Sequence, residues 1–308
     1  MSRIHEALKK AEQARAASQG VQPEAGRAGD MPDMNPVAVL PGPAAPAPDV
    51  PVFSTQSPAD PMLSRCAQAT WHPDQITMLF FGAQDHRRGT EEFRTLRSRL
   101  YQLREKMPLK KLLVSSALPK EGKSFVAANL AQVMVKQQGC RVLLIDGDLR
   151  GSKLHESLGT SGAPGLSEYL MRENDEFSIV QRGSMDNLFF IPAGRPLSTP
   201  AELIANGQFK FLLDRLEPLF DWIVIDSPPA VPVSDASVLA NFCDGVLMVV
   251  RSQLTPFDMA RKARLDFHDK QLIGVVLNGN DYHASAYSRY YQYADRTAEG
   301  TAKVKSKE

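Results

Sequence analysis

The stretch VSSALPKEGKSF, residues 114–125, decides the fold because it joins an apolar run to a helix-forming run through a loop. The run before it predicts a buried strand, and the alanine- and valine-rich run after it predicts a helix. Gly122, Lys123 and Ser124 fit the end of the phosphate-binding pattern G-x-x-x-x-G-K-[ST], whereas Ala117 takes the place of the first glycine. Loop N–H groups and a helix N-terminus together hold phosphate oxygens. The stretch therefore predicts a phosphate site, and a chance strand-turn-helix is the alternative.

Two further stretches place carboxylates at the ends of apolar strands. LLIDGDLRG, residues 143–151, carries Asp146 and Asp148, which point to the same side of an extended chain because they are two residues apart. WIVIDSPPA, residues 222–230, carries Asp226 in the manner of an acid that holds Mg²⁺ directly or through water. Each stretch alone is also compatible with a strand-end turn. The three motifs in this order predict one nucleotide and metal site.

The rest of the pattern predicts an α/β fold of the P-loop NTPase type, with a mostly parallel sheet and helices on both faces. Short continuous apolar runs alternate with helical stretches, as in parallel sheets that are covered on both sides. The expected helices cover 90–105, with Thr90 as a cap, and 123–139, ended by Gly139. Ligands of such sheets bind at the carboxyl ends of the strands, where all three motifs lie. The expected strands are 110–117, 140–148, 187–194, 220–230, 245–252 and 272–280.

Composition divides the 308 residues into four parts. Residues 1–17 predict a short amphipathic helix, which either docks on a partner or frays without a role. Residues 18–75 hold 11 of the 22 prolines and predict a disordered, extended linker. Residues 76–281 predict the P-loop domain, and residues 282–308 a flexible tyrosine-rich tail.

Charge and cysteine content narrow the classes of function and the compartment. The net charge of +1 gives no reason to expect a nucleic-acid partner. The cysteines lack metal or redox spacing and fit a reducing cytosol, and there is no run of about 18 apolar residues. We therefore expect a cytoplasmic protein, which a partner could hold at the inner face of the plasma membrane. The three cysteines are Cys66, Cys140 and Cys243.

On these motifs the chain resembles the bacterial P-loop tyrosine kinases of capsule and exopolysaccharide synthesis, in their detached cytoplasmic form. The loop of that family reads roughly SSxxPGEGKS, so SSALPKEGKS matches it and Ala117 is a family feature. LLIDGDLR and WIVIDSPP match the second and third motifs, and the resemblance covers about residues 85–293. Three positions depart from the family: Lys120 replaces a glycine, Phe125 a threonine and Ser152 a proline.

The resemblance implies a protein-tyrosine kinase that uses ATP and Mg²⁺. Lys123, Asp146 and Asp148 are then the catalytic residues, with Asp146 accepting or orienting the proton of the acceptor tyrosine. The metal is assigned to Ser124, Asp148 and Asp226. ATP is assigned to the loop residues Pro119, Lys120, Glu121, Gly122, Lys123, Ser124 and Phe125.

Two features outside the motifs match the same family. Glu91, Arg94 and Arg97 have the E-x-x-R-x-x-R spacing that the family uses to close a homo-oligomeric ring; a solvated helix face is the alternative. Five of the seven tyrosines cluster in a polar terminal segment, which suits autophosphorylation in a neighbouring subunit, or else an aromatic tail that is never modified. These are Tyr282, Tyr287, Tyr290, Tyr291 and Tyr293.

The resemblance also implies a membrane partner, a chain-length-determinant protein of polysaccharide export that activates the kinase. Two other readings compete with the kinase. One is an ATPase switch of the partitioning type, against which Leu118 counts because those proteins carry an extra lysine at this position. The other is a non-catalytic, nucleotide-binding scaffold of the export machinery, whose role would not depend on Lys123.

Overall fold

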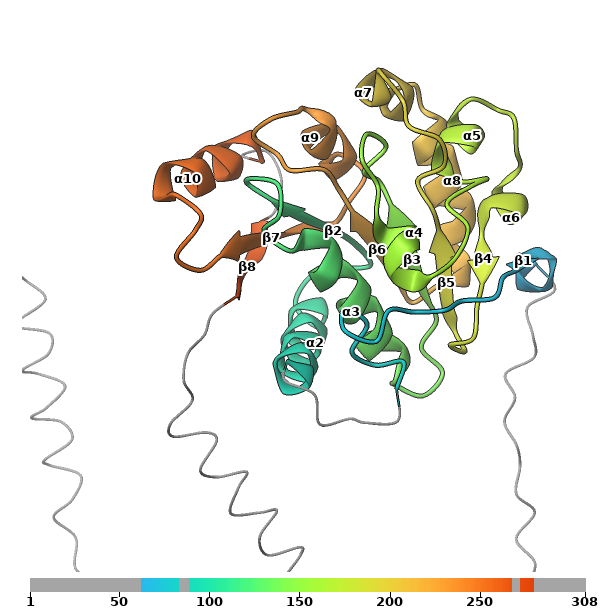
Figure 1. Cartoon of the computed structure of the whole chain (residues 1–308), viewed down its shortest axis with the longest axis horizontal. Coiled ribbons are helices and arrows are strands. Elements are labelled where there is room, and N and C mark those ends of the chain that lie inside the picture. Colours follow the sequence, from blue (N-terminus) through green and yellow to red (C-terminus); the bar gives the residue numbers. More distant parts are fainter. Residues whose placement is uncertain (1–61, 83–88, 268–271, 280–308) are drawn as a thin grey trace, which may run out of the picture. The chain divides into compact units, whose positions relative to one another are not determined.

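The computed structural model describes residues 62–82, 89–267 and 272–279. The expected N-terminal helix, most of the expected linker and the tyrosine-rich tail lie outside these residues. The described chain forms a single eight-stranded sheet between two layers of helices (Figure 1). Its α/β class, its largely parallel strands and its two helical layers confirm the fold predicted from the sequence.

The strand order across the sheet is β1-β4-β5-β3-β6-β2-β7-β8. Neighbouring strands are parallel, except that β4 and β5 are antiparallel. All six predicted strands are present, as β2, β3 and β5 to β8. The bounds are β1 Ala67–Gln68, β2 Lys111–Ser116, β3 Val142–Asp146, β4 Gln181–Arg182, β5 Leu188–Ile191, β6 Trp222–Asp226, β7 Gly245–Arg251 and β8 Leu272–Asn278.

The helices divide between the two faces of the sheet. Helices α2, α3 and α4 pack on one face, and α5 to α10 pack on the other. The bounds are η1 Leu63–Arg65, α2 Thr90–Arg104, α3 Lys123–Val135, α4 Leu154–Leu158, α5 Leu166–Leu170, α6 Glu176–Ile179, α7 Pro200–Ala205, α8 Gln208–Leu216, η2 Glu217–Leu219, α9 Asp235–Ala240 and α10 Phe257–Asp266.

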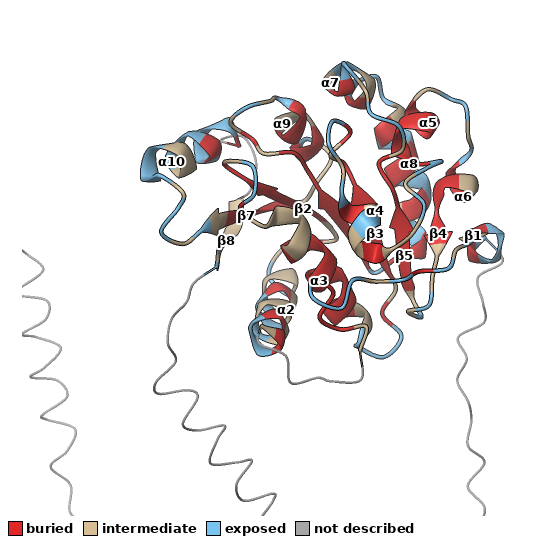
Figure 2. Ribbon diagram, viewed as in Figure 1, coloured by how far each residue is buried: buried red, intermediate tan, exposed pale blue. Residues whose placement is uncertain are grey.

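The core explains why the central strands are continuous apolar runs. Successive side chains of a strand point to opposite faces, so Leu112 packs under α3 while Leu113 packs under the other helical layer. Both are fully buried, and Figure 2 shows the central strands buried along their length. Burying one leucine side chain contributes about 1.5–3 kcal/mol. The cost of exposing either face holds the strand ends, and hence the three motifs, in fixed positions.

The structure corrects two boundaries that the sequence predicted. The linker expected to reach residue 75 is already packed from residue 62: β1 pairs with β4, and Trp71 is buried with its ring edge-on to Phe190 at 6.4 Å. Apolar side chains among the prolines give this segment a place on the sheet. Thr90 is the first residue of α2 rather than its cap, because Gly89, with φ of 101°, holds the cap position.

Candidate active site

The three motifs converge because they follow three neighbouring strands. β6 lies between β3 and β2, and the phosphate-binding loop follows β2. Asp146 and Asp226 lie directly opposite one another in register. The Gly147 N–H donates to the Asp226 carbonyl oxygen at 2.8 Å, and a Cβ at Gly147 would lie 2.7 Å from that oxygen. A glycine between the two acids of the second motif thus lets the strand ends approach.

Lys123, the first residue of α3, lies at the centre of the site. Its Nζ is 3.2 Å from Oδ2 of Asp148 and 3.3 Å from Oγ of Ser124. The Lys123 and Asp148 side chains are only 14% and 13% exposed. Burial lowers the pKa of Lys123, but the carboxylates of Asp226 and Asp148 outweigh this and the net pKa is raised. Lys123 is therefore a fixed positive charge at the N-terminus of a helix, where phosphate oxygens bind.

Asp146 and Asp226 are the most deeply buried acids of the site, 0% and 1% exposed. Burial first, and the charge of Asp226 second, raise the pKa of Asp146 well above its ordinary value. Burial also raises the pKa of Asp226, against the opposing effects of Lys123 and of a hydrogen bond from Ser124. Among the described residues, Oδ1 of Asp226 has no hydrogen-bond partner. A buried oxygen without a partner, beside Ser124 and Asp148, fits Mg²⁺, which prefers oxygen ligands.

Ser152 contributes to the site in a way that sequence reasoning missed. Its Oγ donates a short hydrogen bond to Oδ2 of Asp146 and lies 3.4 Å from Nδ1 of His155. The sequence marked Ser152 only as a departure from a family proline. A proline has no hydroxyl, so this bond to the buried acid is a consequence of the departure.

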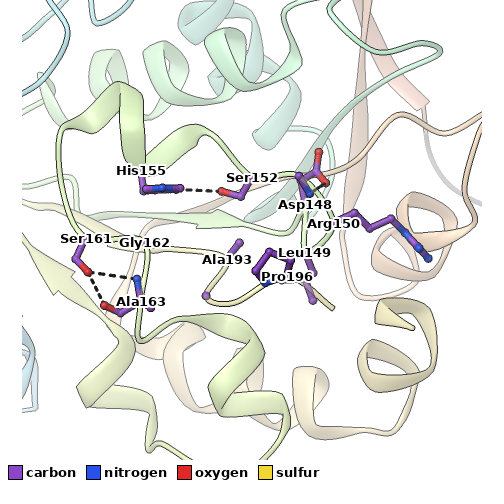
Figure 3. A pocket seen from close by; sticks show the side chains of 12 residues that line it. Asp148, Leu149, Arg150, Ser152, His155, Ser161, Gly162, Ala163, Ala193 and Pro196 are labelled. Carbon is purple, nitrogen blue, oxygen red and sulfur yellow. Dashed lines mark hydrogen bonds between the residues drawn. The ribbon is translucent and has the colours of Figure 1, made fainter. Parts of the chain in front are cut away.

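A pocket opens beside the second motif, with a volume of about 410 Å³. Figure 3 shows Ser152 and His155 directed toward one another at one wall, with Asp148 nearby. Arg150 extends away from them, and its guanidinium binds the Asp235 carboxylate of α9 at 2.6 and 3.0 Å. Asp148 thus lines the pocket and also accepts a hydrogen bond from Lys123.

The predicted loop residues differ in where their side chains lie. Pro119 and Lys120 are exposed, and Lys120 has a φ of 65°, the left-handed conformation that its family glycine adopts without strain. The Glu121 carboxylate is buried, 3% exposed, and Leu118 N–H donates to it at 2.8 Å. The Phe125 ring packs edge-on to Phe93 of α2 with centroids 5.7 Å apart.

Of the two features outside the motifs, the structure describes the E-x-x-R-x-x-R residues of α2 but not the tyrosine-rich tail. Glu91 and Arg94 form an ion pair along α2, whereas Nη1 of Arg97 donates to the Val133 carbonyl of α3 at 2.8 Å. Arg97 therefore also holds α2 on α3. The five tail tyrosines lie outside the described residues. Within the described part of the chain, no helix has the length and apolarity needed to cross a bilayer.

The fold and the site define a P-loop NTPase. The model of the ParA family, described as NUBPL iron-transfer P-loop NTPase, matches residues 109–306. Tyrosine-protein kinase YwqD of Bacillus subtilis is 33% identical over 210 residues, which are 68% of this chain and 87% of that protein. Tyrosine-protein kinase wzc of Salmonella typhimurium is 33% identical over 205 residues, but the match covers only 28% of that longer protein.

The comparison with solved structures also finds a bacterial tyrosine kinase. The kinase domain of the Escherichia coli tyrosine kinase ETK superposes with a TM-score of 0.59 at 31% identity, covering 64% of this chain and 77% of that domain. The chain belongs to the bacterial tyrosine-protein kinases, a family of P-loop proteins. Some members, such as YwqD, match it over most of their own length. This confirms the family that the loop and the two acidic motifs indicated.

Proposed function

We propose that the protein is an ATP-dependent protein-tyrosine autokinase that regulates capsule or exopolysaccharide polymerisation and export. The observation that carries the proposal is the convergence of Lys123 and Ser124 with three carboxylates at adjacent strand ends. Phosphoryl transfer depends mainly on positioning and on charge stabilisation, which such a cluster supplies. The names of the matching relatives point to tyrosine as the acceptor.

Each residue of the cluster has a role that its surroundings support. The Lys123 ammonium and the loop N–H groups hold the charge of the β- and γ-phosphates. Ser124, Asp148 and Asp226 would hold Mg²⁺, which neutralises phosphate charge when it is bound. Asp146 orients or accepts the phenol proton. Because the phenol pKa is near 10, this help need only be modest.

The acceptor tyrosine would enter the pocket beside Asp148 and Ser152. We infer that it comes from the tail of an adjacent subunit in a ring, with Glu91 and Arg94 on the contact surface. Each phosphorylated tyrosine adds about −1.5 to −2 charges at neutral pH. Repulsion between such groups would favour release of the subunits. A membrane chain-length-determinant protein would recruit the kinase to the inner face of the membrane and activate it.

The test is phosphotyrosine mass spectrometry after the purified chain is incubated with Mg²⁺-ATP. It is run with and without the cytoplasmic part of the membrane partner. Lys123→Met should abolish the signal on residues 282–293, whereas Lys210→Met should not. Lys210 is the matched control because it pairs with Asp214 on the surface of α8. ATP binding without phosphotyrosine under either condition would instead favour the ATPase switch or the scaffold.

A further inference from the structure

Glu121 lies inside the phosphate-binding loop, but its carboxylate is directed into the protein. It is 3% exposed, and both of its oxygens are engaged. Oε2 accepts from the Leu118 N–H at 2.8 Å, and Oε1 accepts a short hydrogen bond from Oγ1 of Thr255. A buried acid is stable only when it is satisfied in this way. Its side chain is therefore committed to the loop and to the segment that follows β7.

The last residues of β7 and β8, Arg251 and Asn278, bind the loop backbone next to the Glu121 side chain. Nη1 of Arg251 donates to the Lys120 carbonyl at 3.0 Å, and Nδ2 of Asn278 donates to the Glu121 carbonyl at 2.9 Å. The Arg251 N–H in turn donates to Oγ1 of Thr255 at 2.9 Å. Residues from the ends of β7 and β8, far along the chain, thus hold two consecutive carbonyls and one carboxylate of the loop.

These bonds act on the part of the loop that is hardest to keep in shape. Lys120 has a φ of 65° and Gly122 a φ of 95°, so left-handed residues flank Glu121 on both sides. A non-glycine residue in this region is strained and persists only where its surroundings enforce it. The alternation of backbone conformations also sets the direction in which the loop N–H groups point.

We propose that Glu121 and Thr255 are positioning residues that hold the phosphate-binding loop in its ATP-binding conformation, and that the Glu121 side chain does not contact ATP. This rests on the proposed function, in which the loop N–H groups hold the phosphates. The ATP-binding role predicted for Glu121 then belongs to its backbone N–H rather than to its carboxylate. Thr255, which no motif marked, also gains a role.

Two pairs of variants separate positioning from a merely structural role. Thr255→Val removes both the donor to Glu121 and the acceptor for the Arg251 N–H, whereas Thr255→Ser keeps both. Glu121→Ala leaves the Leu118 N–H without an acceptor, whereas Glu121→Gln keeps one acceptor oxygen. Thr160→Val is the matched control. The Thr160 hydroxyl donates to Oε1 of Gln181 at 2.7 Å, and neither residue belongs to the loop.

The experiment measures amide hydrogen exchange of peptide 114–125 in the nucleotide-free protein and the Kd for Mg²⁺-ATP of the same variants. We expect Thr255→Val and Glu121→Ala to speed exchange and raise the Kd about tenfold, without a change at distant peptides. Thr255→Ser, Glu121→Gln and Thr160→Val should stay within about threefold of the parent protein.

Exchange and affinity within twofold of the parent in Thr255→Val would overturn the inference, as would weaker ATP binding with unchanged exchange. If Thr255→Val unfolds, the Glu121→Ala and Glu121→Gln pair decides in the same way. A parent protein that binds ATP but forms no phosphotyrosine would refute the kinase proposal alone, because exchange and Kd still test the loop. A parent protein that binds no ATP would overturn both.

Discussion

Asp146→Asn is the substitution for which the structure predicts opposite effects on stability and activity. Asp146 is fully buried beside Asp226, and burial together with that second charge raises its pKa from 3.8 to about 7. In the folded state its ionised form is therefore disfavoured. Asparagine has the same shape and carries no charge in either state. It should remove a penalty that the site imposes on the nucleotide-free protein.

Proton linkage gives the direction in which the unfolding free energy changes with pH. The folded state keeps the Asp146 proton to a higher pH than the unfolded state, so the free energy of unfolding falls as pH rises from about 4 to 7. Each pH unit across this interval costs about 1.4 kcal/mol. Between pH 5 and pH 8 the parent protein should therefore lose about 3 kcal/mol that Asp146→Asn does not lose.

The assay is urea unfolding of metal-free, nucleotide-free protein at pH 5 and pH 8. Fluorescence of Trp71 and Trp222, both buried, reports the transition. Asp146→Asn should gain stability relative to the parent at pH 8 more than at pH 5, and should lose phosphoryl transfer. Asp175→Asn is the control: the Ser178 N–H lowers the pKa of this exposed cap, so a small loss should be alike at both pH values.

An equal change in the stability of Asp146→Asn at both pH values, or a greater destabilisation at pH 8, would refute the raised pKa of Asp146 as the cause. Mg²⁺ provides a second check. A cation bound at the acids relieves their repulsion, so added Mg²⁺ should stabilise the parent at pH 8 more than it stabilises the variant.

Three further substitutions test separate parts of the structure. Ser152→Ala removes a hydrogen bond that favours ionised Asp146, so the acid limb of the kcat–pH profile should move to higher pH; an unchanged limb would count against the role of Asp146. Lys120→Gly should change the unfolding free energy by less than about 1 kcal/mol, because relief of the positive φ offsets the backbone entropy that glycine loses on folding. A loss above about 2 kcal/mol in urea unfolding would instead show that the lysine side chain stabilises the loop. Leu113→Ala should cost about 2–5 kcal/mol in the same assay, against about 0.5 or less for Leu254→Ala, which is 66% exposed; equal losses would contradict the placement of the core.

Local sequence was sufficient for the central strands, for the helices α2 and α3, and for the three stretches that carry the candidate site residues. β2, the loop and α3 are each contiguous, and their apolar runs and glycine have a local physical cause, so residues 110–135 could be read directly. The same holds for β3 and β6, whose last residues are Asp146 and Asp226. Since parallel strands carry their ligands at one edge, the sequence could also place the three motifs together.

Only the tertiary structure decided which groups touch. It placed β6 between β3 and β2, set Asp146 opposite Asp226, and joined Thr255 to Glu121 across more than a hundred residues of chain. It also added β1, two residues long and too short to show a period. Such contacts depend on how distant segments pack around a shared core. A local sequence pattern predicts the conformation of each segment. The partner of a buried carboxylate depends on how all the segments pack together.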